Sequence, residues 1–298
     1  MGDLLYHYST TPAAFAILQT RTIRLSPLSA ANDSLEGRIV GRVFADALGT
    51  MGLAPGVTRA ASIIAQGYAD STEGFAFCLS EAGDLLSQWR AYAADGSGIA
   101  IGFDPDVLTR DFGRVSFGSQ YFELLKVAYG EDSITGELET IAKTVFEGMA
   151  VHGDFVRVAS GLSDDEARRR LADRSVNAAG VFVGGPRADE LLSKLLGLMH
   201  PLHFRIYGVK PSPFHEEREW RLVRYQPRAP DRNVEFSADD DTIRPFVSCL
   251  ISDEAKQAIR KVVLGPKHHS DANWVRAFLR SLGLDKVDVT RSAIESYR

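Results

Sequence analysis

The stretch His215-Glu-Glu-Arg-Glu-Trp-Arg-Leu-Val223 decides how the rest of the sequence is interpreted. Pro211 and Pro213 precede it and predict an extended lead-in, because each proline restricts its own backbone and that of the preceding residue. The tryptophan, leucine and valine of the stretch are β-prone, and Pro227 closes the run. The pattern therefore predicts a β-strand.

Alternation along this strand places Glu217, Glu219 and Arg221 on one face. Neighbours on one face of a strand lie roughly 6.5–7 Å apart. Two carboxylates at this spacing, with an arginine beside them, can have different chemical roles. One stays ionised opposite developing positive charge, and the other orients or deprotonates a nucleophile. The alternative interpretation is the solvated face of an edge strand that carries a Glu–Arg pair.

Composition places the chain among ordinary globular proteins. Its 298 residues are 45% hydrophobic and 24% charged, and its formal net charge is −5. This charge argues against broad electrostatic capture of nucleic acid or of an acidic membrane. Cys78 and Cys249 are far apart and lack metal-ligand spacing, which fits a reduced compartment. Without a secretory signal or an apolar run of about 18–20 residues, we expect a cytoplasmic protein with no membrane partner.

The hydrophobic pattern predicts both strands and helices. Strands are expected at residues 4–9, 22–26, 75–80, 99–103, 245–250, 262–266 and 287–290. Helices are expected at residues 13–20, 35–48, 57–68, 81–94, 134–157, 164–176, 189–202 and 271–282. We therefore expect one α+β domain over residues 1–298, with a helical insertion over residues 131–203. In the first helix Phe15, Ile17 and Leu18 are expected near the core.

Two groups of side chains are candidates for ligand contact. His7 lies on the first predicted strand beside the hydroxyls of Tyr8 and Ser9. Trp89 and Tyr92 are three residues apart and so share one face of a predicted helix. A histidine in a strand is more often a satisfied core or surface residue, and an aromatic pair of this kind is more often part of a core.

Three further motifs have simpler interpretations. Asn32 or Asp33, with Glu36, fits the capping box of the following helix. The run 168–170 of three arginines fits a solvated helix face, and it is also a candidate phosphate contact. The segment His200-Pro-Leu-His203 lacks the carboxylate and the helical continuity of a zinc site.

The motifs together resemble a family, mostly from bacteria and phages, known as domain of unknown function 2971. The resemblance extends over nearly the full length. The matching pieces, in order, are Leu5-Tyr6-His7-Tyr8-Ser9, Asn32-Asp33 with Glu36, Phe77-Cys78-Leu79-Ser80, Trp89 with Tyr92-Ala93, 98–103, Lys210, Glu217 with Glu219-Trp220-Arg221, Val263 with Gly265-Pro266, and Ser292 with Ile294 and Arg298.

A weaker resemblance is to the ADP-ribosyltransferase superfamily. It rests on an early strand with a histidine, a central strand ending in Ser80 beside aromatic residues, and a late Glu-x-Glu strand. This resemblance implies a split antiparallel β-sheet core and NAD as substrate. Two features depart from it: Cys78-Leu-Ser80 stands where many of these transferases have Ser-Thr-Ser, and the helical insertion is additional.

The same resemblance implies roles for particular residues. His7 would bind the adenosine ribose, and Tyr92 or Trp89 would stack near the nicotinamide. Glu219 would bind the nicotinamide-side ribose as the catalytic carboxylate, and Glu217 would assist the acceptor. The remaining residues implied to contact NAD are Tyr8, Ser9 and Ser80.

The expected function is transfer of ADP-ribose from NAD to a macromolecular acceptor, or simple NAD cleavage, without a metal ion. Such an activity would suit a toxin or a phage-defence effector. One alternative is a non-catalytic module that binds a nucleotide or a partner. A second is a metal-dependent nucleotide or phosphodiester hydrolase, which would require the fold to gather Asp33, Glu36, Glu217 and Glu219.

Overall fold

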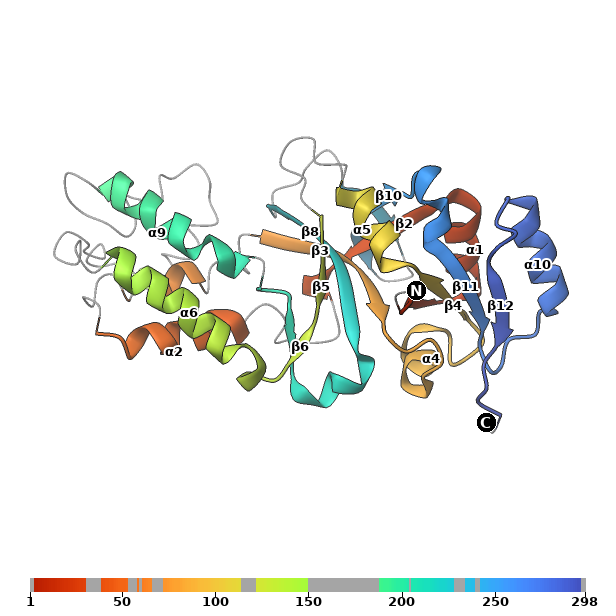
Figure 1. The fold of residues 1–298 in the computed structure, drawn as a ribbon, viewed down its shortest axis with the longest axis horizontal. Coiled ribbons are helices and arrows are strands. Elements are labelled where there is room, and N and C mark those ends of the chain that lie inside the picture. The colour runs from red at the N-terminus through yellow and green to blue at the C-terminus, as the bar shows by residue number, and fades with distance from the viewer. Residues whose placement is uncertain are drawn as a thin grey trace.

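The structure is a computed structural model. It describes residues 3–30, 39–52, 58, 61–65, 72–113, 122–149, 188–203, 205–227, 234–238 and 242–295. A large sheet with helices on its surface fills the middle and one end of the elongated molecule, and a group of helices fills the other end (Figure 1). This confirms the α+β class expected from the sequence.

Ten of the described strands form one mixed sheet, in which only the β11–β12 pair is parallel. The path runs β12-β11-β4-β1-β3-β2-β10-β9, and β8 joins β3 to β5. The strands are β1 (Leu5–Ser9), β2 (Thr22–Pro27), β3 (Thr72–Ser80), β4 (Ile99–Phe103), β5 (Phe122–Lys126), β8 (Glu219–Pro227), β9 (Glu235–Ala238), β10 (Ile243–Leu250), β11 (Ile259–Leu264) and β12 (Asp288–Arg291). A separate two-stranded parallel sheet contains β6 (Ala128–Tyr129) and β7 (Val209–Lys210).

The sheet divides along one edge of β3. β8 pairs with the other edge over the whole length of β3. On the divided edge, β1 pairs only at Ser80, whereas β2 pairs only at Phe75 and Ala76. Between these two contacts, at residues 77–79, this edge of β3 pairs with neither β1 nor β2. This gap positions the candidate site.

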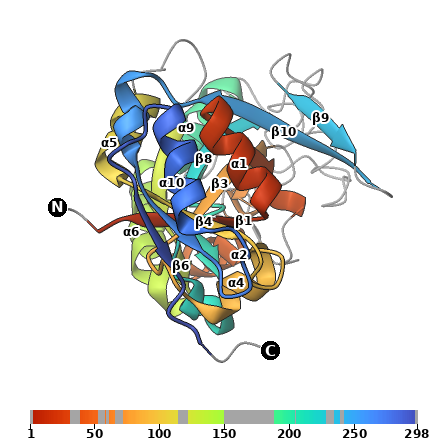
Figure 2. The same ribbon diagram turned by 90° about the vertical axis from the view of Figure 1, so that its right-hand side faces the viewer.

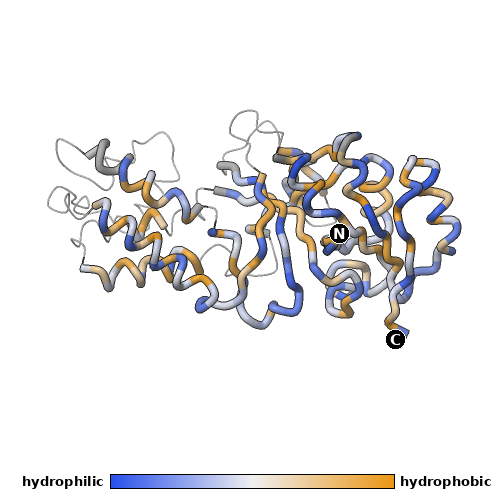
Figure 3. Tube along the Cα trace, in the orientation of Figure 1, coloured by the Kyte–Doolittle hydropathy of each residue, from blue (hydrophilic) through white to orange (hydrophobic). Residues whose placement is uncertain are grey.

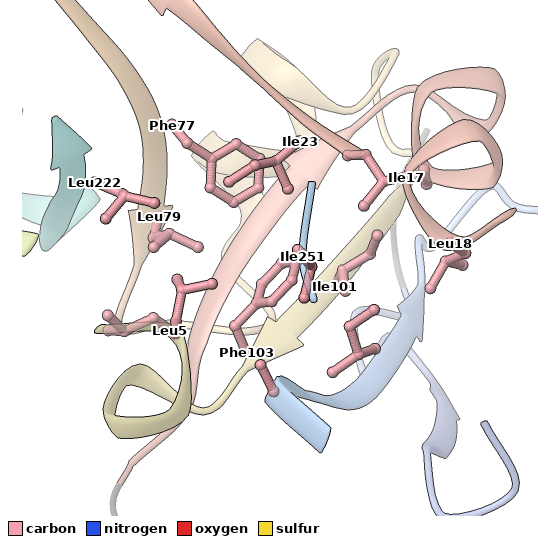
Figure 4. Close-up of a cluster of buried hydrophobic side chains, with 14 of the residues drawn as sticks. Leu5, Ile17, Leu18, Ile23, Phe77, Leu79, Ile101, Phe103, Leu222 and Ile251 are labelled. Atoms are coloured by element: carbon pink, nitrogen blue, oxygen red, sulfur yellow. The ribbon is translucent and has the colours of Figure 1, made fainter. Parts of the chain in front are cut away.

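The main core lies on the side of the sheet covered by α1 (Thr11–Thr20), α5 (Pro105–Gly113) and α10 (Ala272–Ser281). Figure 4 shows Ile17 and Leu18 of α1 beside strand residues such as Ile101 and Phe103. The expectation for Phe15 is wrong, because its side chain is 45% exposed and stacks on Phe278 at the surface.

The helix α4 (Leu86–Tyr92) is shorter than the predicted helix over residues 81–94. The segment before it is fixed by side chains instead of helical bonds, since Ala82 N donates to Ser80 and Leu85 N donates to the Tyr8 hydroxyl. At its other end the chain turns through Ala94, which has a positive φ of 48°. Local side-chain bonds therefore compete with the helical pattern here.

A second, mostly aliphatic core joins α2 (Ile39–Gly49), α6 (Asp132–Met149) and α9 (Ala188–His203), with Phe44 fully buried in it. Apolar and polar residues alternate along these helices (Figure 3), as expected for helices that bury one face. The ends of the predicted insertion are thus helical. The expected helix over residues 164–176 and the arginine run 168–170 lie outside the described residues.

Several described elements escaped prediction. They are α5, β5, β6, β7, β9 and three 3₁₀ helices, Leu28–Ala30, Ser212–Glu217 and Glu254–Ala258. In Figure 2 the β9–β10 pair extends to one side of the sheet. None of the helices in the described part of the chain combines the length and the apolar character needed to span a bilayer.

Candidate functional site

A cavity of about 660 Å³ opens where β1 and β2 part along β3. This volume lies within the range of small-molecule sites, about 300–1,000 Å³. Its lining comes from β1, β2, β3, β7, β8, β9 and β10, from α4, and from the 3₁₀ helices Leu28–Ala30 and Ser212–Glu217. The lining residues used below are His7, Tyr8, Arg24, Ser26, Cys78, Tyr92, Lys210, Glu217, Glu219, Arg221, Ser237, Arg244 and Phe246.

One side of the cavity, which we call the carboxylate wall, consists of Tyr92, Lys210, Glu217, Glu219 and Arg221. Lys210 Nζ lies 2.7 Å from Glu217 Oε2 and 2.8 Å from Glu219 Oε2. The Tyr92 hydroxyl donates to Glu217 Oε1 at 3.1 Å. One ammonium group therefore bridges two carboxylates, and the phenol fixes the free oxygen of the outer one.

Arg221 completes this wall from the same strand as Glu219. Its Nε and Nη2 donate to the two oxygens of Glu219 at 2.8 and 3.0 Å, a bidentate pair. Its Nη1 donates to the Tyr207 carbonyl at 2.7 Å. Glu219 is only 6% exposed and Arg221 only 1%, so the pair is a buried ion pair whose hydrogen-bonding groups are matched.

These contacts determine the ionisation of the wall. Burial acts to raise the pKa of Glu219, but Arg221 and Lys210 outweigh it and hold that pKa at about 2. For Lys210, burial acts to lower the pKa, and Glu219 and Glu217 reverse the effect and raise it. Burial also raises the pKa of the Cys78 thiol, which faces Glu219. Glu219 is therefore ionised and Cys78 is a neutral thiol throughout the physiological range.

The strand prediction for this stretch is correct only from Glu219 onward. Glu217 ends the 3₁₀ helix Ser212–Glu217, and Arg218 has a left-handed backbone with φ 44°. Of the two prolines before it, Pro211 has the extended backbone that was predicted, with φ −56° and ψ 146°. Pro213 instead lies in the first turn of this helix, where proline is tolerated. Glu217 and Glu219 are therefore linked by the Lys210 ammonium group, which contacts both carboxylates, and not by neighbouring positions on one strand face.

The edge-strand interpretation of this stretch is also wrong. β8 lies between β3 and β5, with Ser80 opposite Glu219 and Cys78 opposite Arg221. The face that carries Glu219 and Arg221 is buried. Alternation correctly puts Trp220 with the core on the reverse face.

His7 occupies the gap in the sheet. Its Nδ1 lies 2.8 Å from the Cys78 carbonyl, and its ring stacks on Phe77 at 4.0 Å. A carbonyl only accepts, so Nδ1 carries the hydrogen and Nε2 is left as an acceptor. Burial lowers the pKa of His7 to about 4, against the opposing effect of the Cys78 bond. The imidazole that lines the cavity is therefore neutral.

The side of the cavity beyond the other edge of β3, which we call the arginine wall, consists of Arg24, Ser26, Ser237, Arg244 and Phe246. The guanidinium carbon of Arg24 lies 4.4 Å from the centroid of the Phe246 ring. Arg244 pairs across the β9–β10 ladder with Ser237. Alternation along β10 puts Arg244 on the same face as Phe246. The two arginines are exposed, unlike the ions of the carboxylate wall.

The structure brings five of the eight predicted site residues to the cavity: His7, Tyr8, Tyr92, Glu217 and Glu219. Although Tyr8 lines it, its hydroxyl donates to the Ala82 carbonyl and accepts from Leu85 N, so this group supports the loop before α4.

The other three predicted site residues do not line the cavity. The Ser80 hydroxyl donates to the Glu217 backbone carbonyl, and thus it holds the end of the 3₁₀ helix against β3. Ser9 is buried near the end of β1. Trp89 is fully buried, packs edge-on against Tyr8 and donates to Asp84. Only Tyr92 of the aromatic pair is placed to meet a ligand.

Arg24, Arg244 and Phe246 were missed as site residues. A signal was present, because strand alternation in residues 22–26 puts Arg24 with Ser26, and in residues 243–246 it puts Arg244 with Phe246. What sequence could not supply was the pairing of β2 with β10, which brings these four together. Lys210 was noted only as part of a family motif.

Within the described residues, no group of three or more His, Cys, Asp or Glu side chains is placed to hold a metal ion. Asp33 and Glu36 lie outside those residues, and so does the capping box predicted there. Of the four acids that the hydrolase alternative requires, the described residues therefore include only Glu217 and Glu219. Glu217 forms an ion pair with Lys210, and Glu219 forms ion pairs with Lys210 and Arg221.

No curated protein and no solved structure matches the chain. A family model matches residues 88–222, less than half of the 298-residue chain. The match begins inside α4 and ends inside β8, so it contains the whole carboxylate wall and excludes His7 and the arginine wall. Residues 88–222 thus carry the pattern of the family described as "Protein of unknown function (DUF2971)".

Proposed function

We propose that the cavity binds NAD and that the protein cleaves its nicotinamide–ribose bond, passing ADP-ribose to a macromolecular acceptor or to water. One observation carries this proposal: His7 from β1, Tyr92 from α4 and the Glu217–Glu219 pair line a single cavity at a split in the sheet. These are the residue types, in the chain order, that the resemblance to ADP-ribosyltransferases implies.

The chemistry requires a fixed negative charge beside the sugar. When the bond between the ribose C1′ and the nicotinamide nitrogen breaks, its electron pair leaves with the nicotinamide. Positive charge then develops on the sugar, as in glycoside cleavage. Glu219 is ionised at all physiological pH values and held by Arg221, so its position requires no reorganisation during the reaction. The nucleophile then bonds to C1′ and loses a proton.

The remaining lining groups suit the rest of such a ligand. The neutral His7 offers Nε2 as an acceptor for a ribose hydroxyl. Tyr92 is 39% exposed, and its ring supplies a surface on which a planar base can stack. Its hydroxyl aligns Glu217, the helper carboxylate of the proposal.

A second candidate function is favoured by the state of Glu219. Both of its oxygens already accept from Arg221, and one also accepts from Lys210. A carboxylate whose charge is already balanced by two bonded cations is suited to a structural role, in which it keeps the neighbouring side chains in place. This favours a non-catalytic module that binds a nucleotide or a partner in the same cavity.

The deciding experiment measures nicotinamide release from NAD by the wild type, Glu219→Gln and Tyr92→Phe, with and without cell lysate as acceptor. Release that collapses in Glu219→Gln supports the reaction, and dependence on lysate separates transfer from hydrolysis. Since Glu219→Gln also disturbs a buried ion pair, the melting temperature of each variant is measured in parallel. Tyr92→Phe removes one hydroxyl at a half-exposed position and provides a variant that keeps the ion pair.

The two candidates give different results. The reaction predicts release together with an NAD-induced rise in melting temperature. The binding module predicts the same rise without release. Absence of both in the wild type contradicts the proposal that NAD is the ligand.

A further inference from the structure

The two-stranded sheet β6–β7 adjoins the carboxylate wall, and the proposed reaction leaves most of it unused. In Figure 1, β6 lies between the large sheet and α6. Ala128 of β6 and Val209 of β7 pack into the second core. Tyr129 is the register partner of Lys210, and Gly130 N donates to the Lys210 carbonyl at 2.8 Å. The helical group thus anchors two strands whose next residues are Tyr129 and Lys210.

This sheet and the residue before it hold the backbone of Glu219. Glu219 N donates to the Tyr129 hydroxyl oxygen at 2.7 Å, and Val127 N donates to the Glu219 carbonyl at 2.9 Å. Lys210 Nζ lies 2.8 Å from a carboxylate oxygen of the same glutamate. The segment that contains β6 therefore fixes the backbone of Glu219, and β7 contacts its side chain.

The bond from Tyr129 lies where the backbone needs support. Arg218, directly before Glu219, has a φ of 44°, in a region that is unfavourable for a residue with a Cβ atom. The Ser80 hydroxyl fixes one side of this turn by donating to the Glu217 carbonyl at 2.7 Å, and Tyr129 fixes the other. In a regular strand the two glutamates would lie roughly 6.5–7 Å apart. Here both carboxylates contact one ammonium group.

Tyr129 is suited to a positioning role and not to contact with a ligand. Its ring is half-buried and packs against the buried cluster that includes Tyr207 and Tyr225, and it is not among the described residues that line the cavity. Burial is the main cause that raises the pKa of Tyr129 to about 12, and the charges of Glu219 and Glu217 act in the same direction. The hydroxyl is therefore neutral at physiological pH and adds no further negative charge beside the two carboxylates.

We propose that Tyr129 is a positioning residue of the carboxylate wall, whose hydroxyl holds the Arg218 turn so that Glu217 and Glu219 stay on one ammonium group. Resting on the proposed function, this assigns Tyr129 to the bond-breaking step and not to the binding of NAD. Glu219 acts when positive charge develops on the sugar, and a displaced carboxylate stabilises that charge less. The rest of the cavity still binds the ligand, so the loss falls on the transition state.

The test compares Tyr129→Phe with the control Tyr225→Phe. The control removes a buried hydroxyl from β8, on a ring of the cluster against which Tyr129 packs, and it leaves the cavity lining unchanged. For each variant, kcat and KM for nicotinamide release are measured well below its melting temperature. A small misplacement of a reacting group can cost about 100-fold in rate, so kcat should fall about 10- to 100-fold in Tyr129→Phe with KM nearly unchanged. The control should keep both values.

A second measurement requires no NAD. Glu217→Gln weakens the contact with Lys210 that the two carboxylates share. If Tyr129 holds both carboxylates on that ammonium group, the losses of unfolding free energy caused by Tyr129→Phe and Glu217→Gln in urea are not additive, because both changes act on one network. The losses caused by Tyr225→Phe and Glu217→Gln should add.

The positioning role is overturned if the losses of Tyr129→Phe and Glu217→Gln add, or if Tyr129→Phe has the kcat of an active wild type. A fall in melting temperature with kcat unchanged makes Tyr129 a purely structural residue and also overturns it. The outcome is separate from that of the reaction. A wild type that releases no nicotinamide contradicts the reaction, and the measurement in urea then upholds or overturns the role of Tyr129 by itself.

Discussion

The carboxylate wall and the arginine wall lie on either side of β3, and they differ in the burial and bonding of their charged side chains. On the first, Glu219 and Arg221 are buried and bonded to each other and to Lys210. On the second, Arg24 and Arg244 are exposed, and a phenylalanine ring supports Arg24. The difference shows that one cavity can combine a buried ion-pair network, whose disruption costs stability, with exposed cations whose removal is expected to cost little stability.

The largest effect is expected when the buried pair is broken. Arg221→Met leaves Glu219 buried with Lys210 as its remaining cation and removes the bond to the Tyr207 carbonyl. Breaking a buried ion pair by removing one partner costs about 3–5 kcal/mol, so the free energy of unfolding in urea should fall by that amount. A fall below about 1 kcal/mol would show that this wall behaves like a surface pair, which would abolish the contrast between the walls.

A second prediction concerns acid pH. The pKa of Glu219 is lowered to about 2 in the folded protein, from an ordinary value near 4.5. A lowered pKa stabilises the fold above pH 4.5, and the contribution is lost as the pH falls toward 2. The gap in unfolding free energy between the wild type and Glu219→Gln should therefore narrow as the pH falls through this window. A gap that stays constant from pH 5 to pH 2 argues against the ion pair as the source of the shift.

The smallest effect is expected on the arginine wall. Arg24→Met removes an exposed cation and its contact with Phe246, worth about 0.5–1 kcal/mol at an exposed site. Unfolding free energy should fall by no more than about 1 kcal/mol, as measured by chemical denaturation beside Arg221→Met. A loss of stability as large as that of Arg221→Met would assign this arginine a structural role.

Much of the sheet could be predicted because its signals are local. Alternating residues at 219–223 correctly separate Glu219 and Arg221 from Trp220, and the strand that carries His7 is present where it was expected. The pattern also predicted α10, whose described bounds are Ala272–Ser281. Local sequence is sufficient here because the hydrophobic period matches the element that forms.

The assembly of the cavity could not be predicted because it depends on contacts between distant residues. Arg24 meets Phe246, and Tyr92 meets Glu217. Neither pairing has a signal in a single sequence. The pair Trp89 and Tyr92 illustrates the same limit. Helical spacing puts both on one face, yet α4 ends at Tyr92, so one residue is buried and the other is exposed beside the cavity.

The sharing of one edge of β3 by β1 and β2 has a consequence for synthesis on the ribosome. β4 requires β11 as its outer neighbour, and the arginine wall requires β10, so both halves of the split wait for residues 243–264 to emerge. Sheets with such long-range pairing fold slowly. A nascent chain that has already released His7, Tyr92 and Glu219 therefore still lacks a closed cavity. Any ligand-dependent activity of the cavity is therefore expected only after residues 243–264 have been made.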